Sequence, residues 1–384
     1  MATYYVRGDA DGLGDGTTTG TSGATGAWTF SQFVTAFKSG AGAAGDTVWV
    51  CAIGGTIART TAVDDITKDG TAVLPITIRG CYETANDLDT PTYNVDGTLD
   101  TTRYPSITYT TGRWSGSGAD FVHLRAIKFS GAPTNYLVYM GNNCVITQCS
   151  VTQTGNHGSA VCLYTGTIGD VVNCDFIGNS GTLGSLVETS GATITANRFK
   201  TVSSRAINCS ASGAVLVGNT FFAPVGTSAV AIDHSSTNTG HELNIVAYNT
   251  IVGGWDIGIK AANAANDRIM HIVNNHITGC LTAGIKTLYT TSMRAALIVG
   301  NRLRDNGTGG NVVGYDNWYA TFAGLNTTTA GTDATDFVNP SLNDYRLRAN
   351  SPGATAAIGG GSAAARAASS RGGVLSRPGR AGRF

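Results

Sequence analysis

Short apolar strands recur along this chain, and seven of them end on an equivalent, inward-facing position. The steps between these positions are 25, 23, 22, 30, 26 and 26 residues. In each repeat, this position follows a short apolar stretch, and a bulky residue stands two places after it. Examples are Ile194-Thr-Ala-Asn-Arg-Phe199 and Leu216-Val-Gly-Asn-Thr-Phe221. The seven positions are Cys149, Cys174, Asn197, Asn219, Asn249, Asn275 and Asn301. A period in the twenties without a helical pattern predicts a parallel β-solenoid, in which each repeat forms one turn.

Asparagine dominates this column, and its chemistry suits a tight corner. Its side chain tolerates the left-handed backbone conformation, and stacked copies can hydrogen-bond to one another from turn to turn. Cys149 and Cys174 are expected to continue the column as small apolar residues, and Ala126 to start it, 23 residues before Cys149. The column is therefore predicted to be a structural ladder.

A second strand is predicted in most turns, at a similar distance from the ladder. Its segments are Leu137-Val-Tyr139, Ala160-Val-Cys162, Leu186-Val-Glu188, Ala206-Ile-Asn208, Ala231-Ile-Asp233, Gly258-Ile-Lys260 and Gly284-Ile-Lys286. The last residue of five of them is polar and predicted to face outward. These residues form a file of Glu188, Asn208, Asp233, Lys260 and Lys286.

The two ends of the chain depart from the repeat. Thr29 to Lys38 places Phe30, Phe33, Val34 and Phe37 at helical spacing behind a Thr29–Gln32 capping box, which predicts a short helix covering the first turn. The acidic segment 83–104 is too long for a corner and is predicted to project as a surface loop. The predicted organisation is an N-terminal loop and cap (1–45), a β-helix (46–356) and an Ala/Gly/Arg-rich tail (357–384).

Composition supports short strands and tight turns. Gly accounts for 52 of 384 residues, only 13% of residues are charged, and the formal net charge is zero, which disfavours a globally basic nucleic-acid binder. The eight cysteines are scattered, mostly inside apolar strands, and are predicted to be buried free thiols. No CxxC pair is present, so a thiolate zinc site is not expected, and neither a metal nor a cofactor is predicted. The sequence shows no export signal and no membrane span.

The first and last thirds of the chain carry a resemblance to a known family. Tyr4-Tyr-Val, Asp15-Gly-Thr, the cap helix and Gly45-Asp-Thr-Val-Trp-Val50 resemble the start of the pectate-lyase-like, right-handed parallel β-helix superfamily. Asp336-Phe-Val-Asn-Pro340 and Asn343-Asp-Tyr-Arg-Leu347 are similar to its closing motif. The resemblance implies an all-β fold. It leaves the activity open, because the superfamily includes polysaccharide lyases, glycoside hydrolases, epimerases and bacteriophage tailspike shafts.

The sequence favours a bacteriophage virion protein within this superfamily. Relatives that act on polysaccharides are usually exported, whereas a virion protein folds in the host cytoplasm without a signal peptide. From Arg346 to Phe384 the chain has seven arginines and no Asp, Glu or Lys. This tail is expected to bind a capsid or tail protein through Arg366, Arg371, Arg377, Arg380 and Arg383. Such a protein is a capsid decoration or a spike, and by resemblance a homotrimer. The alternatives are a solvated tail without a partner and, least favoured, contact of the tail with packaged nucleic acid.

The alternative function is a polysaccharide-degrading tailspike enzyme, either a lyase or a glycoside hydrolase. The polar file supplies its candidate residues. Glu188 and Asp233, with His234 beside Asp233, are the candidate catalytic residues, because glycoside hydrolysis uses two carboxylates that flank the scissile bond. Trp255, Lys260 and Lys286 are candidates for binding a host-surface glycan. The competing interpretation is that acids followed by lysines along a solenoid face form cross-strand ion pairs only.

Overall fold

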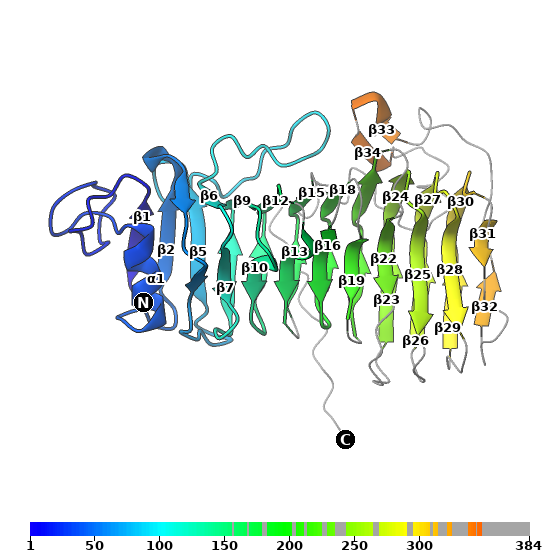
Figure 1. Cartoon of the computed structure of the whole chain (residues 1–384), viewed down its shortest axis with the longest axis horizontal. Coiled ribbons are helices and arrows are strands. Elements are labelled where there is room, and N and C mark those ends of the chain that lie inside the picture. The colour runs from blue at the N-terminus through cyan, green and yellow to red at the C-terminus, as the bar shows by residue number, and fades with distance from the viewer. Residues whose placement is uncertain are drawn as a thin grey trace, which may run out of the picture.

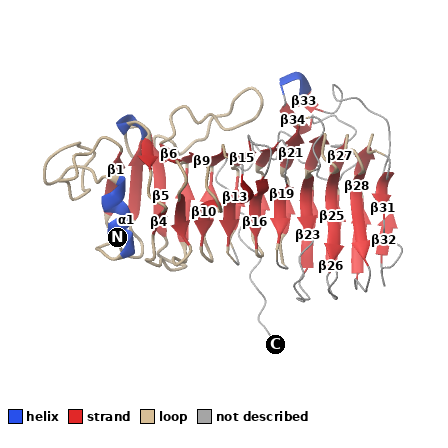
Figure 2. Ribbon diagram, in the orientation of Figure 1, coloured by secondary structure: helices blue, strands red, loops and turns tan. Residues whose placement is uncertain are grey.

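The computed structural model describes most of the repeat region and its N-terminal cap. The described residues are 1–155, 157–166, 169–178, 183–201, 205–210, 213–224, 229–234, 243–263, 269–289, 295–307, 310–313, 321–324, 337–342 and 344–347. The predicted fold, a right-handed parallel β-helix with a short N-terminal helix, is confirmed. Successive strands stack along one axis (Figures 1 and 2).

Each regular turn contributes one strand to each of three parallel sheets, A, B and C. Sheet A contains β1 (Thr3–Arg7), β2 (Thr47–Cys51), β5 (Ile76–Cys81), β8 (Val122–Arg125), β11 (Val145–Thr147), β14 (Asp170–Val172), β17 (Thr193–Thr195), β20 (Val215–Val217), β23 (Leu243–Ala247), β26 (Ile269–Val273), β29 (Ala295–Val299) and β32 (Thr321–Gly324). Sheet B contains β3 (Ile57–Arg59), β6 (Ser106–Tyr109), β9 (Lys128–Gly131), β12 (Ser150–Gln153), β15 (Asp175–Gly178), β18 (Arg198–Thr201), β21 (Thr220–Ala223), β24 (Thr250–Gly253), β27 (His276–Thr278) and β30 (Arg302–Arg304). Sheet C contains β4 (Val63–Asp65), β7 (Arg113–Gly116), β10 (Tyr136–Met140), β13 (His157–Thr165), β16 (Leu183–Thr189), β19 (Arg205–Cys209), β22 (Val230–His234), β25 (Ile257–Asn263), β28 (Ala283–Tyr289) and β31 (Gly310–Val313).

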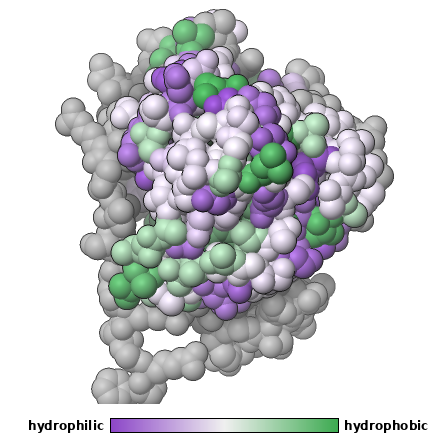
Figure 3. All heavy atoms as spheres, turned by 90° about the vertical axis from the view of Figure 1, so that its left-hand side faces the viewer, coloured by the Kyte–Doolittle hydropathy of each residue, from purple (hydrophilic) through white to green (hydrophobic). Residues whose placement is uncertain are grey.

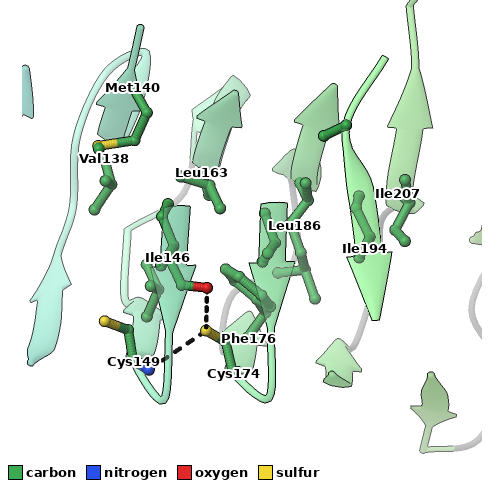
Figure 4. Packing of buried hydrophobic residues seen from close by; sticks show 14 of the residues in the cluster. Val138, Met140, Ile146, Cys149, Leu163, Cys174, Phe176, Leu186, Ile194 and Ile207 are labelled. Atoms are coloured by element: carbon green, nitrogen blue, oxygen red, sulfur yellow. Dashed lines mark hydrogen bonds between the residues drawn. The ribbon is translucent and has the colours of Figure 1, made fainter. Parts of the chain in front are cut away.

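The core is a set of apolar columns that run along the helix axis. In sheet B, Phe176, Phe199 and Phe221 are register partners, and their rings stack with centroids 5.2 and 4.8 Å apart. Side chains from all three sheets point into the same interior (Figure 4). Because every turn buries its apolar residues against both neighbours, the hydrophobic core is continuous from turn to turn.

The predicted asparagine ladder is present at the corner between sheets A and B. Each Asn in it is at most 1% exposed, and Nδ2 of Asn219, Asn249 and Asn275 donates to Oδ1 of the next Asn at 2.9–3.0 Å. The same amide groups also donate to a carbonyl of the preceding turn, such as Leu216 O for Asn249 at 3.0 Å. Cys174 continues the column and accepts from the backbone N–H of Cys149 through its sulfur (Figure 4). The ladder therefore satisfies buried polar groups in a dry corner.

The residue with the left-handed backbone conformation lies one position before each ladder residue. The sequence-based explanation had assigned this conformation to the ladder asparagines themselves and was wrong on this point. Asn173, Ala196, Gly218 and Tyr248 have φ between 54 and 66°, and each directly precedes a ladder residue. The first regular corner follows the same rule, because Ala126 has a φ of 54°. Since Lys128 pairs with Ser150, the ladder position of that turn is Ile127, and the assignment of Ala126 was wrong by one residue.

The N-terminal end of the core is closed by α1 (Phe30–Lys38). Thr29 and Gln32 form the predicted capping box, and Phe30, Phe33, Val34 and Phe37 are buried. The ring of Phe33 stacks on Trp114 of β7, with centroids 5.8 Å apart. Seen from this end, apolar residues are scattered among polar ones (Figure 3). The cap thus hides the hydrophobic interior of the first turn.

Two segments remote in sequence lie on the outer face of sheet B. The segment 83–104 is on the surface, as predicted, but it folds back along the shaft. Asn173 Nδ2 donates to Tyr93 Oη at 2.6 Å, and Arg198 NH1 lies 3.1 Å from Asp96 Oδ2. Farther along, β33 (Phe337–Asn339) and β34 (Asp344–Leu347) lie beside β21 and β24 (Figure 1). They are joined by the short 3₁₀-helix Pro340–Leu342.

Within the described residues, α1 and two three-residue 3₁₀-helices, Ala52–Gly54 and Pro340–Leu342, are the helical elements. No helix in this part of the chain is long and apolar enough to cross a membrane.

Candidate functional site

The polar file predicted from the sequence forms one column on the outer face of sheet C. Backbone pairing aligns Glu188 with Asn208, Asn208 with Asp233, Asp233 with Lys260, and Lys260 with Lys286. The same register continues toward the N-terminal end through Tyr164 and Tyr139. We call these seven residues the sheet C column: Tyr139, Tyr164, Glu188, Asn208, Asp233, Lys260 and Lys286.

Three tyrosines form the first part of the site. The rings of Tyr139 and Tyr164 stack with centroids 4.7 Å apart and an interplanar angle of 13°. Tyr136 packs against both, with centroid distances of 5.1 Å to each. All three are half-buried, so part of their ring surface faces solvent. Burial raises the pKa of Tyr136 and Tyr139, and the nearby charge of Glu188 adds to both shifts.

Glu188 follows the tyrosines in the column and is half-buried. Burial raises the pKa of its carboxyl group, while the guanidinium of Arg205 acts in the opposite direction. A raised pKa favours the protonated carboxylic acid, which can donate a proton or a hydrogen bond. Glu188 is therefore the described residue of this column that is best suited to act as a general acid.

Asp233 lies in a cationic environment. Its Oδ2 is 3.6 Å from Arg205 NH1 and 3.7 Å from Lys260 Nζ. The Asp233 side chain is only 5% exposed, whereas those of Arg205 and Lys260 are 39% and 26% exposed. The ion pairs proposed as the competing interpretation therefore exist. The exposed charge at this part of the column belongs to the cations.

His234 does not share a face with Asp233. Successive side chains of a strand point to opposite faces, and His234 pairs with the buried Ala261. Its side chain is 3% exposed and turned toward the interior. A substrate bound over Asp233 on the outer face of sheet C is therefore out of reach of His234, because the strand β22 lies between them.

Trp255 is not a glycan-stacking residue, and this prediction was wrong. Its side chain is fully buried in the main core. It follows β24 at a corner, where its backbone carbonyl accepts from Leu281 N at 2.7 Å. Trp114 is also buried, beneath the cap. Among the sheet C residues whose burial the structure describes, the half-buried aromatic side chains are those of Tyr136, Tyr139 and Tyr164.

The arginines of the tail lie outside the described residues: Arg366, Arg371, Arg377, Arg380 and Arg383. The structure thus leaves the predicted attachment tail as a sequence-based hypothesis.

The described residues contain no group of three or more His, Cys, Asp or Glu side chains arranged to hold a metal ion. In the acidic loop 9–16, the carboxylates of Asp9 and Asp15 bind neighbouring groups of the protein. Asp9 forms a bidentate pair with Arg7, at 2.8 Å for both contacts, and Asp15 accepts from Thr17.

Tyr139 ends the predicted segment Leu137-Val-Tyr139, but Tyr164 was missed because its turn was aligned incorrectly. The repeat pattern matched Ala160-Val-Cys162 to Leu186-Val-Glu188, whereas backbone pairing matches Tyr164 to Glu188. The segment Cys162-Leu-Tyr164 has the same apolar-apolar-outward pattern, so the signal was present two residues later. Arg205 was missed because it starts its strand, before the repeated segment.

No protein-family model and no curated protein matches the sequence. Among solved structures, the chain is similar to pectate lyase Pel9A, with a TM-score of 0.47, 11% identity, and coverage of 92% of this chain and 90% of that one. It is also similar to a mannuronic acid specific family 6 polysaccharide lyase from human gut microbiota, with a TM-score of 0.45, 11% identity, and coverage of 84% and 87%. Similarity of this degree gives no indication of the activity or substrate of this chain.

Proposed function

We propose that the chain binds an anionic polysaccharide along the sheet C column. The observation that carries the proposal is the continuity of a half-buried tyrosine cluster with Glu188, Asn208, Asp233 and two lysines in one register. Aromatic rings provide apolar contact area for the faces of sugar rings, and the polar residues provide hydrogen bonds that fix orientation. Because neighbouring turns are about 4.8 Å apart, an extended glycan parallel to the axis contacts several turns at once.

The charges of the column favour an acidic ligand. Lys260 and Lys286 are register partners and half-buried. The guanidinium of Arg205 contacts Asp233, which also contacts Lys260. Sugar carboxylates or sulfates placed over these cations gain electrostatic attraction, while Glu188 at the aromatic end contributes a hydrogen bond.

Binding is tested with a panel of matched anionic and neutral polysaccharides and the full-length protein in affinity electrophoresis. Tyr164→Ala is expected to weaken binding about tenfold, the size of effect that loss of one aromatic contact produces. Tyr82→Ala is the matched control, since Tyr82 is exposed but lies outside sheet C, under the guanidinium of Arg103. Equal loss in both variants, or equal binding of neutral and anionic polymers, contradicts the proposal.

Attachment to a virus particle is the second part of the proposed function. It is supported by the tail sequence, in which seven arginines occur from Arg346 to Phe384 without an acidic residue or lysine. Full-length protein and a version ending at Gly359 are compared for co-sedimentation with emptied host-phage capsids. Binding by the full-length chain alone supports a virion decoration or spike, and equal binding removes the idea. Light scattering during gel filtration tests the expected homotrimer.

A polysaccharide hydrolase remains the second candidate function, favoured by the contrast between Glu188 and Asp233. Glu188 has a raised pKa, as a general acid requires, and Asp233 is held beside two cations. Two register steps separate them, which places their backbones roughly 10 Å apart, near the upper limit for an inverting pair. Because Asp233 is nearly inaccessible, we expect binding without release of reducing ends. Release that disappears in Glu188→Gln and in Asp233→Asn assigns the hydrolase instead.

A further inference from the structure

The cysteines Cys51 and Cys81 are register partners in neighbouring strands, β2 and β5 (Figure 1). Their sulfur atoms lie 2.8 Å apart, and Cys81 Sγ donates toward Cys51 Sγ. Adjacent parallel strands place Cα atoms about 4.8 Å apart, within the range of about 4.4–6.8 Å that disulfides span. The backbone therefore needs no rearrangement to join these two sulfurs.

From this geometry we propose that Cys51 and Cys81 form a disulfide that cross-links the first strands of the β-helix once the protein meets an oxidising environment. The proposal is independent of the glycan site on sheet C. It revises the sequence-based prediction of free thiols for this pair only.

The surroundings of the pair favour its reaction over that of the other described cysteines. Cys51 and Cys81 belong to a small cluster with Trp49, outside the main core, and the exposed residues 82–84 follow Cys81 directly. A hydrogen bond from Cys81 and the guanidinium of Arg7 lower the pKa of Cys51. The thiolate is the nucleophile of thiol–disulfide exchange, so Cys51 is the attacking residue.

All of the cysteines whose burial the structure describes are buried, and Cys51 and Cys81 are 0% exposed, but Cys144 and Cys280 differ from this pair in belonging to the main core. Burial raises the pKa of Cys144 to about 11 and that of Cys280 to about 12. Cys149 and Cys174 are also neighbours in the ladder, but their thiols donate to the backbone carbonyls of Thr147 and Val172, both at 3.4 Å. These thiols serve as small apolar side chains with weak hydrogen bonds.

The reaction requires a low-molecular-weight disulfide, such as oxidised glutathione. The Cys51 thiolate attacks one sulfur of this oxidant and releases one thiolate, which leaves a mixed disulfide on Cys51. Cys81 then loses its proton and attacks the Cys51 sulfur, which expels the second thiolate. One protein S–S bond forms, both cysteines are oxidised, and the oxidant is reduced to two thiols. Because both thiols are buried, we infer that the oxidant reaches them by local opening beside the exposed residues 82–84.

The test uses reduced, folded, full-length protein incubated with oxidised glutathione, alkylated, digested without reduction and analysed by mass spectrometry. The expected product is a peptide pair joined through Cys51 and Cys81, two hydrogen masses lighter than the sum of the reduced peptides. The cross-link is expected to persist in Cys144→Ser and to be absent in Cys51→Ser. Its formation is expected to raise the unfolding midpoint by about 5 °C.

Three results overturn the proposal: both cysteines stay alkylatable after unfolding, Cys51 stops at the glutathione adduct, or other cysteines cross-link instead. Because the wild-type protein gives the decisive readout, a variant that fails to fold does not affect the conclusion.

Discussion

Sheets B and C run side by side through the same turns, yet their outer faces differ. On sheet B, the outward residues Asp175, Arg198 and His276 are at most 4% exposed, because the described segments 83–104 and β33–β34 lie over that face. On sheet C, Tyr164, Glu188 and Lys260 are half-buried. Asp233 is the exception on sheet C, because its side chain is only 5% exposed. The outward residues under the two covering segments of sheet B are thus more deeply buried than most of the sheet C column.

The largest expected effect comes from uncovering sheet B. Phe337 is fully buried and packs against Val252 and the ring of His276, with a centroid distance of 5.3 Å to the latter. Phe337→Ala is expected to lower the free energy of unfolding by about 3–5 kcal/mol, because it removes a buried aromatic ring and leaves a cavity. Urea unfolding measures this change. A loss under about 1 kcal/mol means that the cover adds little to stability.

The covered face is also expected to be sensitive to acid. Burial, with Arg302 and Arg304 nearby, lowers the pKa of His276 from 6.5 to about 3. A lowered pKa gives stability that is present above pH 6.5 and is lost as the pH falls toward 3, on the order of a few kcal/mol. His276→Leu should flatten the pH dependence of the free energy of unfolding in this window. An unchanged slope shows that His276 is not the acid-sensitive group.

A matched pair of cation deletions compares the two faces directly. The Arg198 side chain is 4% exposed and pairs with Asp96, while that of Lys260 is 26% exposed and pairs with Asp233. Arg198→Ala is expected to cost about 2 kcal/mol of unfolding free energy and Lys260→Ala less than about 1 kcal/mol. Lys260→Ala should instead weaken binding of anionic polysaccharide. Equal stability losses remove the distinction between the faces.

The smallest expected effect concerns Glu188 and has the opposite pH dependence. Its pKa is raised by burial, so its contribution to stability is fully present at low pH and is lost as the pH rises through that raised pKa. Glu188→Gln should therefore gain stability relative to the wild type between pH 4 and pH 7. Thermal unfolding midpoints at the two pH values measure the gain, and a relative loss at pH 7 contradicts the assignment.

The local pattern was sufficient to predict the repeat and its inward face. Asn219, Asn249 and Asn275 are recognisable because a buried amide in a solenoid corner needs a partner, and an identical residue one turn away supplies it. The cap was predictable for the same kind of reason, since Thr29 and Gln32 satisfy the helix N-terminus locally.

Register between turns was harder to predict because loop lengths vary. The position equivalent to Cys149 in the preceding turn is Ile127 rather than Ala126, and Tyr164 rather than Cys162 aligns with Glu188. A repeat step identifies a turn, but the hydrogen-bonded pairing of neighbouring strands decides which residues share a column.

By itself, the sequence determined the β-helix, the ladder, the capping helix and the polar file from Glu188 to Lys286, because each follows from spacing within or between adjacent turns. Tertiary structure alone decided that Trp255 is buried, that Tyr164 extends the file, that Cys51 meets Cys81, and that sheet B is covered. These features depend on contacts between segments far apart in the chain. Such contacts are stabilised by the burial of apolar surface, and they form between residues that the strand register brings together. The spacing of residues along the sequence specifies neither of these.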